Sequence, residues 1–264
     1  MRYKLLALDL DGTLLREDKT ISERSKVAIA ECHRQGIEVV IATGRMYISA
    51  LPYARELELT LPIIAYQGAL IREIEGRVVS HLPMTKQETL AVLEHLKKYE
   101  LHINVYIGDR LLMDRESERG KEYAKMIGVV IEYTHFPGGV EEEVTKITVI
   151  GKPETIDQAV AEMDRELAVK LNITRTLNNF LEISDAKATK ATALDTLGEM
   201  LGIKREEIMA FGDSPNDADM IAYAGCGVAM GNAHPSIKEA SDFITLDNER
   251  DGVARVIEKL LLDN

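Results

Sequence analysis

The sequence predicts an α/β protein: a doubly wound, mostly parallel, Rossmann-like sheet core with an inserted α+β domain. Near both ends of the chain, short runs of Leu, Ile, Val and Ala alternate with amphipathic helical segments, the pattern of a sheet buried on both faces. Between them, short strands alternate polar and apolar residues, which is typical of an antiparallel sheet covered on one side by helices. We therefore expect a discontinuous core, residues 1–82 and 187–264, and an insert, residues 83–186.

Composition narrows the class of protein. The chain has 264 residues, a net charge of −12 and a pI of about 5.1, which argues against binding to a nucleic-acid backbone. No apolar run is long enough for a signal peptide or a membrane span. Cys32 and Cys226 lie far apart, without metal-site spacing, as suits a reducing compartment. We expect a cytoplasmic protein without nucleic-acid or membrane partners; its oligomeric state stays open.

The N-terminal segment predicts a βαβαβ unit. Its first strand lies in the run LLALDLDGTLL, residues 5–15. Ser22 is placed to cap a helix that ends at Arg34, and Gly36 follows as a helix-stop residue. The remaining elements expected here are a strand over 37–42, a helix over 47–57 and a strand over 62–66.

The insert and the C-terminal segment continue the two patterns. In the insert we expect helices over 86–99, 117–127 and 154–168 and strands over 103–107, 110–113, 146–150, 172–175 and 181–183. In the C-terminal segment we expect helices over 189–201, 216–224, 235–241 and 252–262 and strands over 208–211, 227–230 and 243–246. The return of the βα alternation after the insert is what makes the core discontinuous.

Asp9 and Asp11 interrupt the first apolar run. Being two residues apart, they project to the same side in extended chain. Like charges 4 Å apart repel by roughly 4 kcal/mol at an effective dielectric of ~20. Either one carboxyl group is protonated, or a cation such as Mg²⁺ lies between them. A helix cap beside a solvated aspartate is the alternative for an isolated Asp-x-Asp.

Other polar groups follow strand ends or open helices. They are Thr43-Gly44, Lys190, and Asp213 with Asn216 and Asp217 in GDSPND. Singly, each has an ordinary explanation: an N-cap, an exposed lysine, or an Asx turn. Together they fall at carboxyl ends of predicted parallel strands or at a helix start, the edge of an α/β sheet where ligands bind.

The order of these motifs resembles that of the haloacid-dehalogenase-like hydrolase superfamily: DLDGT, an apolar strand with TGR, a lysine opening a helix, then GDSPND. An insert of about a hundred residues is similar to the cap of the Cof-type sugar-phosphatase branch. Two positions depart from that branch. Gln67 stands in Gln-Gly-Ala where many relatives have Asn-Gly-Ala, and Ala191 stands where glycine is common. We expect the first to alter contacts near a cap hinge and neither to touch the reacting groups.

The resemblance implies roles for the acidic residues. Asp9 is the nucleophile that forms an aspartyl-phosphate, and Asp11 is the general acid and then the base that activates water. Mg²⁺ is held by Asp9, the backbone carbonyl of Asp11, and Asp213, with Asp217 orienting its waters.

The resemblance also implies a phosphate-binding set. The Thr43 hydroxyl, the Gly44 N–H and Lys190 stabilise the phosphoryl oxygens. Asn216 adds a hydrogen bond there or orients Lys190, and the N–H of Leu10 touches the phosphate.

The insert is expected to act as a mobile cap that excludes water. Its hinges are expected near 82–83 and 185–189. Arg45 follows the second motif and either reaches a substrate hydroxyl or second anionic group, or forms a structural ion pair.

These observations predict a Mg²⁺-dependent phosphatase that hydrolyses small phosphorylated metabolites, sugar phosphates in particular, through an aspartyl-phosphate intermediate. The alternative within the superfamily is a phosphosugar mutase or phosphotransferase. A receiver-like signalling domain also uses an acidic cluster, a Thr and a Lys, but it explains neither the insert nor an acceptor on the first strand. A catalytically silent phosphate-binding protein does not account for the complete acidic set.

Overall fold

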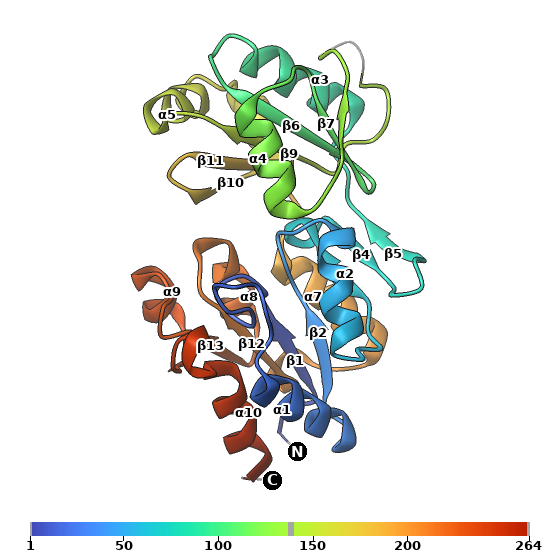
Figure 1. The fold of residues 1–264 in the computed structure, drawn as a ribbon, viewed down its shortest axis with the longest axis vertical. Coiled ribbons are helices and arrows are strands. Elements are labelled where there is room, and N and C mark those ends of the chain that lie inside the picture. The colour runs from blue at the N-terminus through green and yellow to red at the C-terminus, as the bar shows by residue number, and fades with distance from the viewer. Residues whose placement is uncertain (1, 137–139, 263–264) are drawn as a thin grey trace. The chain divides into compact units, whose positions relative to one another are not determined.

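The chain consists of two compact units. The computed structural model describes residues 2–136 and 140–262. One unit comprises residues 1–79 and 189–264, and the other comprises residues 80–188 (Figure 1). From the sequence, we expected the boundaries between residues 82 and 83 and between residues 186 and 187. The two units are described separately below.

The first unit contains the predicted parallel sheet, in the order β14-β13-β12-β1-β2 (Figure 1). All of its neighbouring strands are parallel. Its strands are β1 (Leu5–Leu8), β2 (Glu38–Ile41), β12 (Ile208–Gly212), β13 (Cys226–Ala229) and β14 (Phe243–Ile244). β1 lies between β2 and β12, and its four residues are fully buried, as expected for a strand covered on both faces.

Helices surround this sheet. They are α1 (Glu23–Arg34), α2 (Tyr47–Glu56), α7 (Lys190–Leu201), α8 (Ala218–Tyr223), α9 (Pro235–Ala240) and α10 (Gly252–Leu262). The predicted cap of α1 is present, because the Ser22 side chain accepts from the Ser25 N–H. α7 begins at the cap Thr189 and ends at Gly202, which adopts the left-handed conformation common at helix ends.

The third predicted strand does not simply extend the parallel sheet. β3 (Ile63–Ala65) meets β2 only through one parallel bridge, Ala42 to Ile64. It pairs instead with β4 (Leu70–Arg72), which forms a three-stranded sheet with β5 (Val78–His81). The sequence analysis missed this hairpin, because the chain reverses through a short turn, residues 66–68, without a Pro or Asn signal.

The second unit contains a six-stranded sheet in the order β10-β11-β9-β6-β7-β8, antiparallel except for β7 and β8. Its strands are β6 (His102–Ile107), β7 (Arg110–Met113), β8 (Ile131–Tyr133), β9 (Lys146–Ile150), β10 (Leu171–Leu177) and β11 (Phe180–Asp185). Its helices are α3 (Lys86–Leu96), α4 (Glu118–Ile127), α5 (Pro153–Ala161) and α6 (Arg165–Ala168). The α+β character predicted for the insert is therefore present.

Three details of the second unit differ from the sequence expectations. The helix expected over 154–168 is divided, because the Asp164 side chain accepts from two N–H groups and begins α6 anew. β8 was not expected. Helices contact both faces of the sheet: Ile103 of β6 lies in the core with α3 and α5, whereas Tyr106 bonds Tyr123 of α4 at 2.6 Å.

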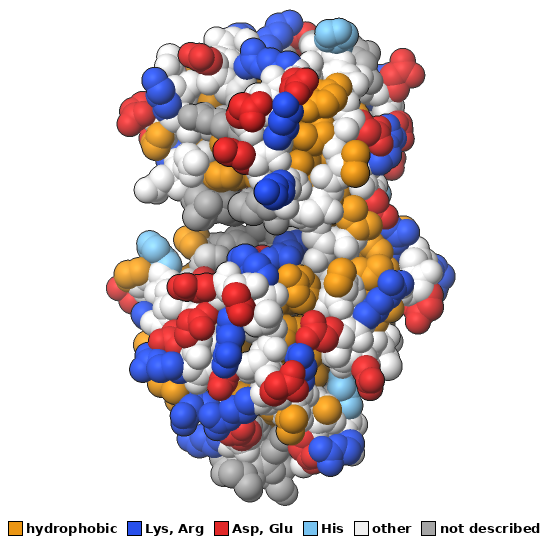
Figure 2. All heavy atoms as spheres, in the orientation of Figure 1, with side chains coloured by type: hydrophobic (Ala, Val, Ile, Leu, Met, Phe, Trp, Pro, Cys, Tyr) orange, Lys and Arg blue, Asp and Glu red, His pale blue; other side chains and the backbone are white. Residues whose placement is uncertain are grey.

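Acidic and basic side chains are interspersed over the face drawn in Figure 2. Among residues 2–136 and 140–262, no helix combines the length and the apolar character that crossing a membrane requires.

Candidate active site

Loops after β1 and β12, together with the start of α7, bring three of the predicted motifs into contact. Asp9 directly follows β1, Lys190 opens α7, and Asp217 lies in the loop after β12. The Lys190 Nζ lies 2.6 Å from Asp9 Oδ1 and 2.6 Å from Asp217 Oδ1. Residues 181 positions apart in sequence thus share one ion-pair cluster, as the sheet-edge argument predicts.

Lys190 occupies an unusual position for a cation. It stands at a helix start, where the helix dipole disfavours positive charge, and it is only 1% exposed. Burial alone lowers the pKa of an ammonium group, yet the adjacent Asp217 and Asp9 raise the pKa of Lys190 above its ordinary value. The lysine therefore remains charged because two carboxylates compensate for its desolvation.

Asp9, Asp213 and Asp217 form a cluster in which one oxygen of each lies within 4.8 Å of the others. Burial raises the pKa of Asp9 well above its ordinary range, and Asp217 and Asp213 add to the rise against the opposing effect of Lys190. Burial and the neighbouring Asp217 likewise raise the pKa of Asp213 to about 7. If all three were ionised, these carboxylates would carry more negative charge than one ammonium group neutralises. These oxygen donors fit a hard divalent cation such as Mg²⁺.

The loop after β12 is shaped around Asp217. Its Oδ2 accepts from the N–H groups of Asp213 and Ser214, both at 3.0 Å. Gly212 is required at the start of this loop, since a Cβ there would lie 2.5 Å from the Asp217 Cβ. On the facing loop, Gly12 has a φ of +80°, and a Cβ there would lie 2.4 Å from an Asp213 carboxylate oxygen. Both glycines let backbone approach the carboxylates closely.

Asp11 lies outside this carboxylate cluster. β1 ends at Leu8, so the strand alternation that predicted a common side for Asp9 and Asp11 does not apply. The Asp11 carboxylate accepts from Arg45 at 2.6 and 2.7 Å and from Lys19 at 2.9 Å. Burial opposes its ionisation, but the bonds from Arg45 and Lys19 lower the pKa of Asp11 to about 2. Of the two alternatives for Arg45, the ion pair is what the structure contains.

The remaining predicted residues lie around these groups. Thr43 is 1% exposed, and its Oγ1 accepts from the Arg45 N–H at 3.2 Å. Leu10 is buried in the turn after β1, where its carbonyl accepts from Thr13 and Leu15. These contacts fix the loop backbone on which both phosphate-binding predictions depend.

Asn216 makes its hydrogen bonds to two residues that were not expected as partners. Its Nδ2 donates to Gln67 Oε1 at 3.0 Å, and its Oδ1 accepts from Ser214 Oγ at 2.5 Å. Among the described contacts there is none between the side chains of Asn216 and Lys190. Lys190 is oriented by carboxylates instead.

Comparison with known proteins identifies the family. A haloacid dehalogenase-like hydrolase model matches residues 6–257. The chain belongs to this family. It is 32% identical to a 5-amino-6-(5-phospho-D-ribitylamino)uracil phosphatase of Bacillus subtilis, over 97% of this chain and 96% of that protein. A haloacid dehalogenase-like hydrolase from Bacteroides thetaiotaomicron has a TM-score of 0.88 at 34% identity, with 98% and 99% of the two chains covered.

A sugar phosphatase of the superfamily's subclass IIB has a TM-score of 0.87 at 26% identity, with 97% of this chain and 98% of that chain covered. The resemblance inferred from the four motifs is therefore confirmed, and so is the α/β core with its separate antiparallel sheet. The protein is an enzyme of the haloacid dehalogenase-like phosphatase type.

Gln67, one of the two departures from the branch's usual pattern, contacts two of the predicted phosphate-binding residues. Its side chain bonds Asn216 and lies against Gly44. The only sequence signal for this contact was the departure from Asn-Gly-Ala itself. The second departure, Ala191, donates its backbone N–H to Asp219 at 3.1 Å. Lys19, which the sequence analysis did not single out, adds a cation beside Asp11.

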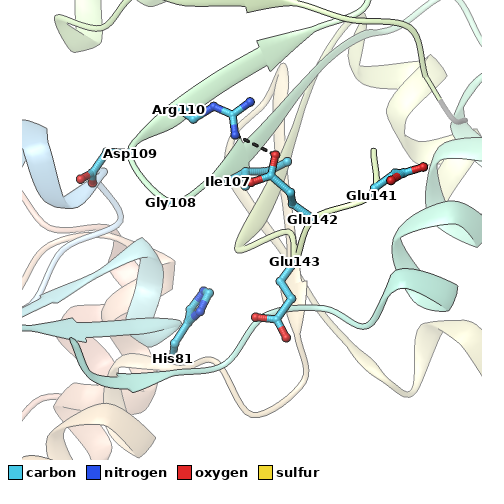
Figure 3. A pocket seen from close by; sticks show the side chains of 8 residues that line it. All are labelled: His81, Ile107, Gly108, Asp109, Arg110, Glu141, Glu142 and Glu143. Carbon is cyan, nitrogen blue, oxygen red and sulfur yellow. Dashed lines mark hydrogen bonds and ion pairs between the residues drawn. The ribbon is translucent and has the colours of Figure 1, made fainter. Parts of the chain in front are cut away.

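The second unit of the hydrolase contains a hollow of about 540 Å³ (Figure 3). Its lining residues are His81, Ile107, Gly108, Asp109, Arg110, Glu141, Glu142 and Glu143. Arg110 is paired with Glu132 and Glu142, both at 2.8 Å. The excess of carboxylates makes this hollow a poor site for a phosphate group.

The metal-free hydrolase is expected to lose stability as the pH rises from about 4 to about 7. Burial and the neighbouring Asp217 raise the pKa of Asp213 to about 7, well above the ordinary value of an aspartate, so the folded protein keeps a proton that the unfolded chain has already released. The loss is on the order of 3 kcal/mol. Urea unfolding in chelator at about pH 5 and about pH 7.5 measures it. Asp213→Asn should reduce the difference in stability between the two pH values, and the remainder is expected from Asp9, whose pKa is also raised. An unchanged difference in that variant contradicts the prediction.

Proposed function

We propose that this phosphatase is a Mg²⁺-dependent phosphomonoesterase that acts on a small sugar phosphate through an aspartyl-phosphate on Asp9. The observation that carries the proposal is the buried Lys190 ammonium group, bonded to Asp9 and Asp217 within a cluster of three carboxylates. Such a cluster provides a nucleophilic oxygen, a fixed cation for phosphoryl oxygens and donors for a metal. The sugar-phosphatase relative supports the substrate class.

The first half of the reaction is assigned to Asp9 and Asp11. A carboxylate oxygen of Asp9 attacks phosphorus, and the bond from phosphorus to the leaving oxygen breaks as Asp11 gives that oxygen a proton. In the second half, water attacks the phosphorus of the aspartyl-phosphate while Asp11 takes the water's proton, which releases inorganic phosphate and restores Asp9. Lys190, the Thr43 hydroxyl and the Gly44 N–H are assigned to the phosphoryl oxygens.

Asp9, Asp213 and the Asp11 carbonyl would hold Mg²⁺, with Asp217 supporting its water ligands. The ion would neutralise negative charge on the carboxylates and on the phosphoryl group. Asp9 and Asp213 are expected to be fully ionised at neutral pH only when the metal ion is bound, because burial otherwise raises their pKa values.

Asp11 is held in the form that suits the base step. Arg45 and Lys19 keep its pKa near 2, so the acid step requires a weakening of these ion pairs. We infer that Arg45 and Lys19 exchange Asp11 for anionic groups of the substrate, which lets Asp11 accept a proton. Residues 80–188 are assigned the role of a cap that sets specificity, as the resemblance implied.

The test is phosphate release from an aryl phosphate, with and without Mg²⁺, followed by a panel of sugar phosphates. We expect Mg²⁺-dependent turnover that chelator abolishes and that excess Mg²⁺ restores. Turnover that is unaffected by chelator contradicts the metal assignment. Retention of the phosphoryl group on a sugar product, without free phosphate, would instead identify the mutase or phosphotransferase alternative.

A further inference from the structure

The turn after β3 has an unusual backbone. Tyr66, Gln67 and Gly68 all have positive φ, at 52°, 58° and 98°. This region is unfavourable for residues with a Cβ, and two successive buried examples are uncommon. The backbone holds them in place, since the Tyr66 N–H donates to the Arg45 carbonyl at 2.9 Å and the Gln67 N–H to the Thr43 carbonyl at 3.0 Å. Strain of this kind persists where surrounding structure imposes it, often at functional sites.

This turn contacts three parts of the candidate site: the loop after β2, the start of α7 and the loop after β12. A Cβ on Gly44, in the loop after β2, would lie 2.4 Å from Gln67 Nε2. A Cβ on Gly68 would lie 2.0 Å from the Thr189 carbonyl oxygen, at the start of α7. Gln67 Oε1 accepts from Asn216, in the loop after β12. The Gln67 side chain therefore spans from the Gly44 loop to the Asn216 loop.

The contact fixes which way the Asn216 amide points. Ser214 Oγ donates to its Oδ1 on one side, and Gln67 Oε1 accepts from its Nδ2 on the other. With Gln67 Oε1 facing Asn216, a flipped Asn216 amide would place two acceptor oxygens against each other. Because Nδ2 carries two protons and Gln67 takes one, the second can be donated to an anion. Gln67 thus keeps Asn216 in the donor orientation that a phosphoryl oxygen requires.

We propose that Gln67 is a positioning residue of the phosphate site, which fixes the Asn216 amide as a donor and seats the Gly44 loop. The proposal rests on the proposed function, because it assigns these two residues to the phosphoryl group. It also explains why a long amide occupies a left-handed position. Glycine or asparagine suits that conformation better, and in this chain the Gln67 side chain is the one that bonds Asn216.

Gln67→Met is the direct test, because methionine matches glutamine in length and lacks β-branching but offers Asn216 no comparable acceptor. We expect kcat/KM for an aryl phosphate to fall roughly tenfold. The dissociation constant of inorganic phosphate, measured by calorimetry with Mg²⁺ present, should rise by a similar factor. The melting temperature should change little, because the backbone strain is the same. Unchanged phosphate affinity would overturn the proposal.

Gln67→Gly separates positioning from structure. Glycine relieves the left-handed strain, so a purely structural role predicts equal or higher stability with full activity. The positioning role predicts the same kinetic loss as Gln67→Met in a protein that remains folded. Retained kcat/KM and phosphate affinity in this folded variant would overturn the proposal.

A double-mutant cycle with Asn216→Ala asks whether Gln67 acts through Asn216. We expect Gln67→Met to add less than twofold to the loss caused by Asn216→Ala. Fully additive losses would show that the two act independently and would overturn the proposal. If the wild type binds phosphate but turns over no ester, the proposed function fails. The phosphate affinities of the wild type and of the Gln67 variants then still test the role of Gln67. A wild type that does neither overturns both.

Discussion

Asp9→Asn is expected to lower kcat by about 10⁴-fold or more while the protein stays folded. The change replaces a carboxylate oxygen by an amide nitrogen at nearly constant volume, so it removes the nucleophile and preserves the packing. Lys190 keeps its second partner, Asp217, at 2.6 Å. Phosphate release from an aryl phosphate measures the loss, and circular dichroism verifies the fold.

The control for this variant is Asp157→Asn. This substitution makes the same chemical change in the second unit, where the Asp157 side chain is 68% exposed and pairs with Arg175. An exposed pair of this kind contributes little, so activity should match the wild type. Near-normal turnover in Asp9→Asn would remove Asp9 from the role of nucleophile.

Lys190→Met is expected to destabilise the metal-free protein by about 3–5 kcal/mol, because it leaves buried carboxylates without their cation. The Lys190 side chain is fully buried between Asp9 and Asp217. Without it, the pKa values of Asp9 and Asp213 should rise further, so the variant should regain stability as the pH falls. Thermal unfolding in chelator at several pH values measures both effects. Activity should also be lost, since Lys190 is assigned to the phosphoryl oxygens.

Lys146→Met provides a matched comparison. Lys146 is also buried and pairs with Glu182 at 2.8 Å, but it lies in the second unit. Both variants should unfold more easily than the wild type. Mg²⁺ should restore more stability to Lys190→Met than to Lys146→Met. Only Lys190→Met removes the cation that compensates the negative charge of the proposed metal ligands. Equal responses to Mg²⁺ would argue against a metal held by Asp9 and Asp213.

Strand periodicity and helix caps predicted most of the core. Buried runs such as Leu5–Leu8 are recognisable as strands because both faces are covered. Ser22 caps the start of α1 as expected, and Gly36, the expected helix-stop residue, has a positive φ just beyond its end. The β3–β4 hairpin escaped prediction, because its turn at 66–68 depends on non-glycine residues held in left-handed conformations by distant carbonyls. The break at Asp164 was missed because an aspartate inside an amphipathic run also fits a helix surface.

The candidate site was predictable to the extent that topology determines it. Parallel strands end at one edge of the sheet, so Asp9, Asp213 and Asp217 could be brought together from sequence order alone. The hydrogen-bond and ion-pair partners of individual side chains could not be predicted in this way. Nothing in the spacing distinguishes an Arg45 that reaches substrate from one that binds Asp11, and the reach of Gln67 depends on a backbone angle that sequence does not display.

The position of β1 has a consequence for how this protein is made. β1 is central in its sheet, yet Leu5 pairs with Glu38 on one side and with Ile208 on the other. During synthesis β1 therefore cannot pair with β12 until most of the chain has left the ribosome. Residues 80–188 contain their own hydrophobic core and can fold in that interval. We expect the nascent enzyme to order its insert first, and its N-terminal strands to complete their sheet only once residues 208–212 have been made.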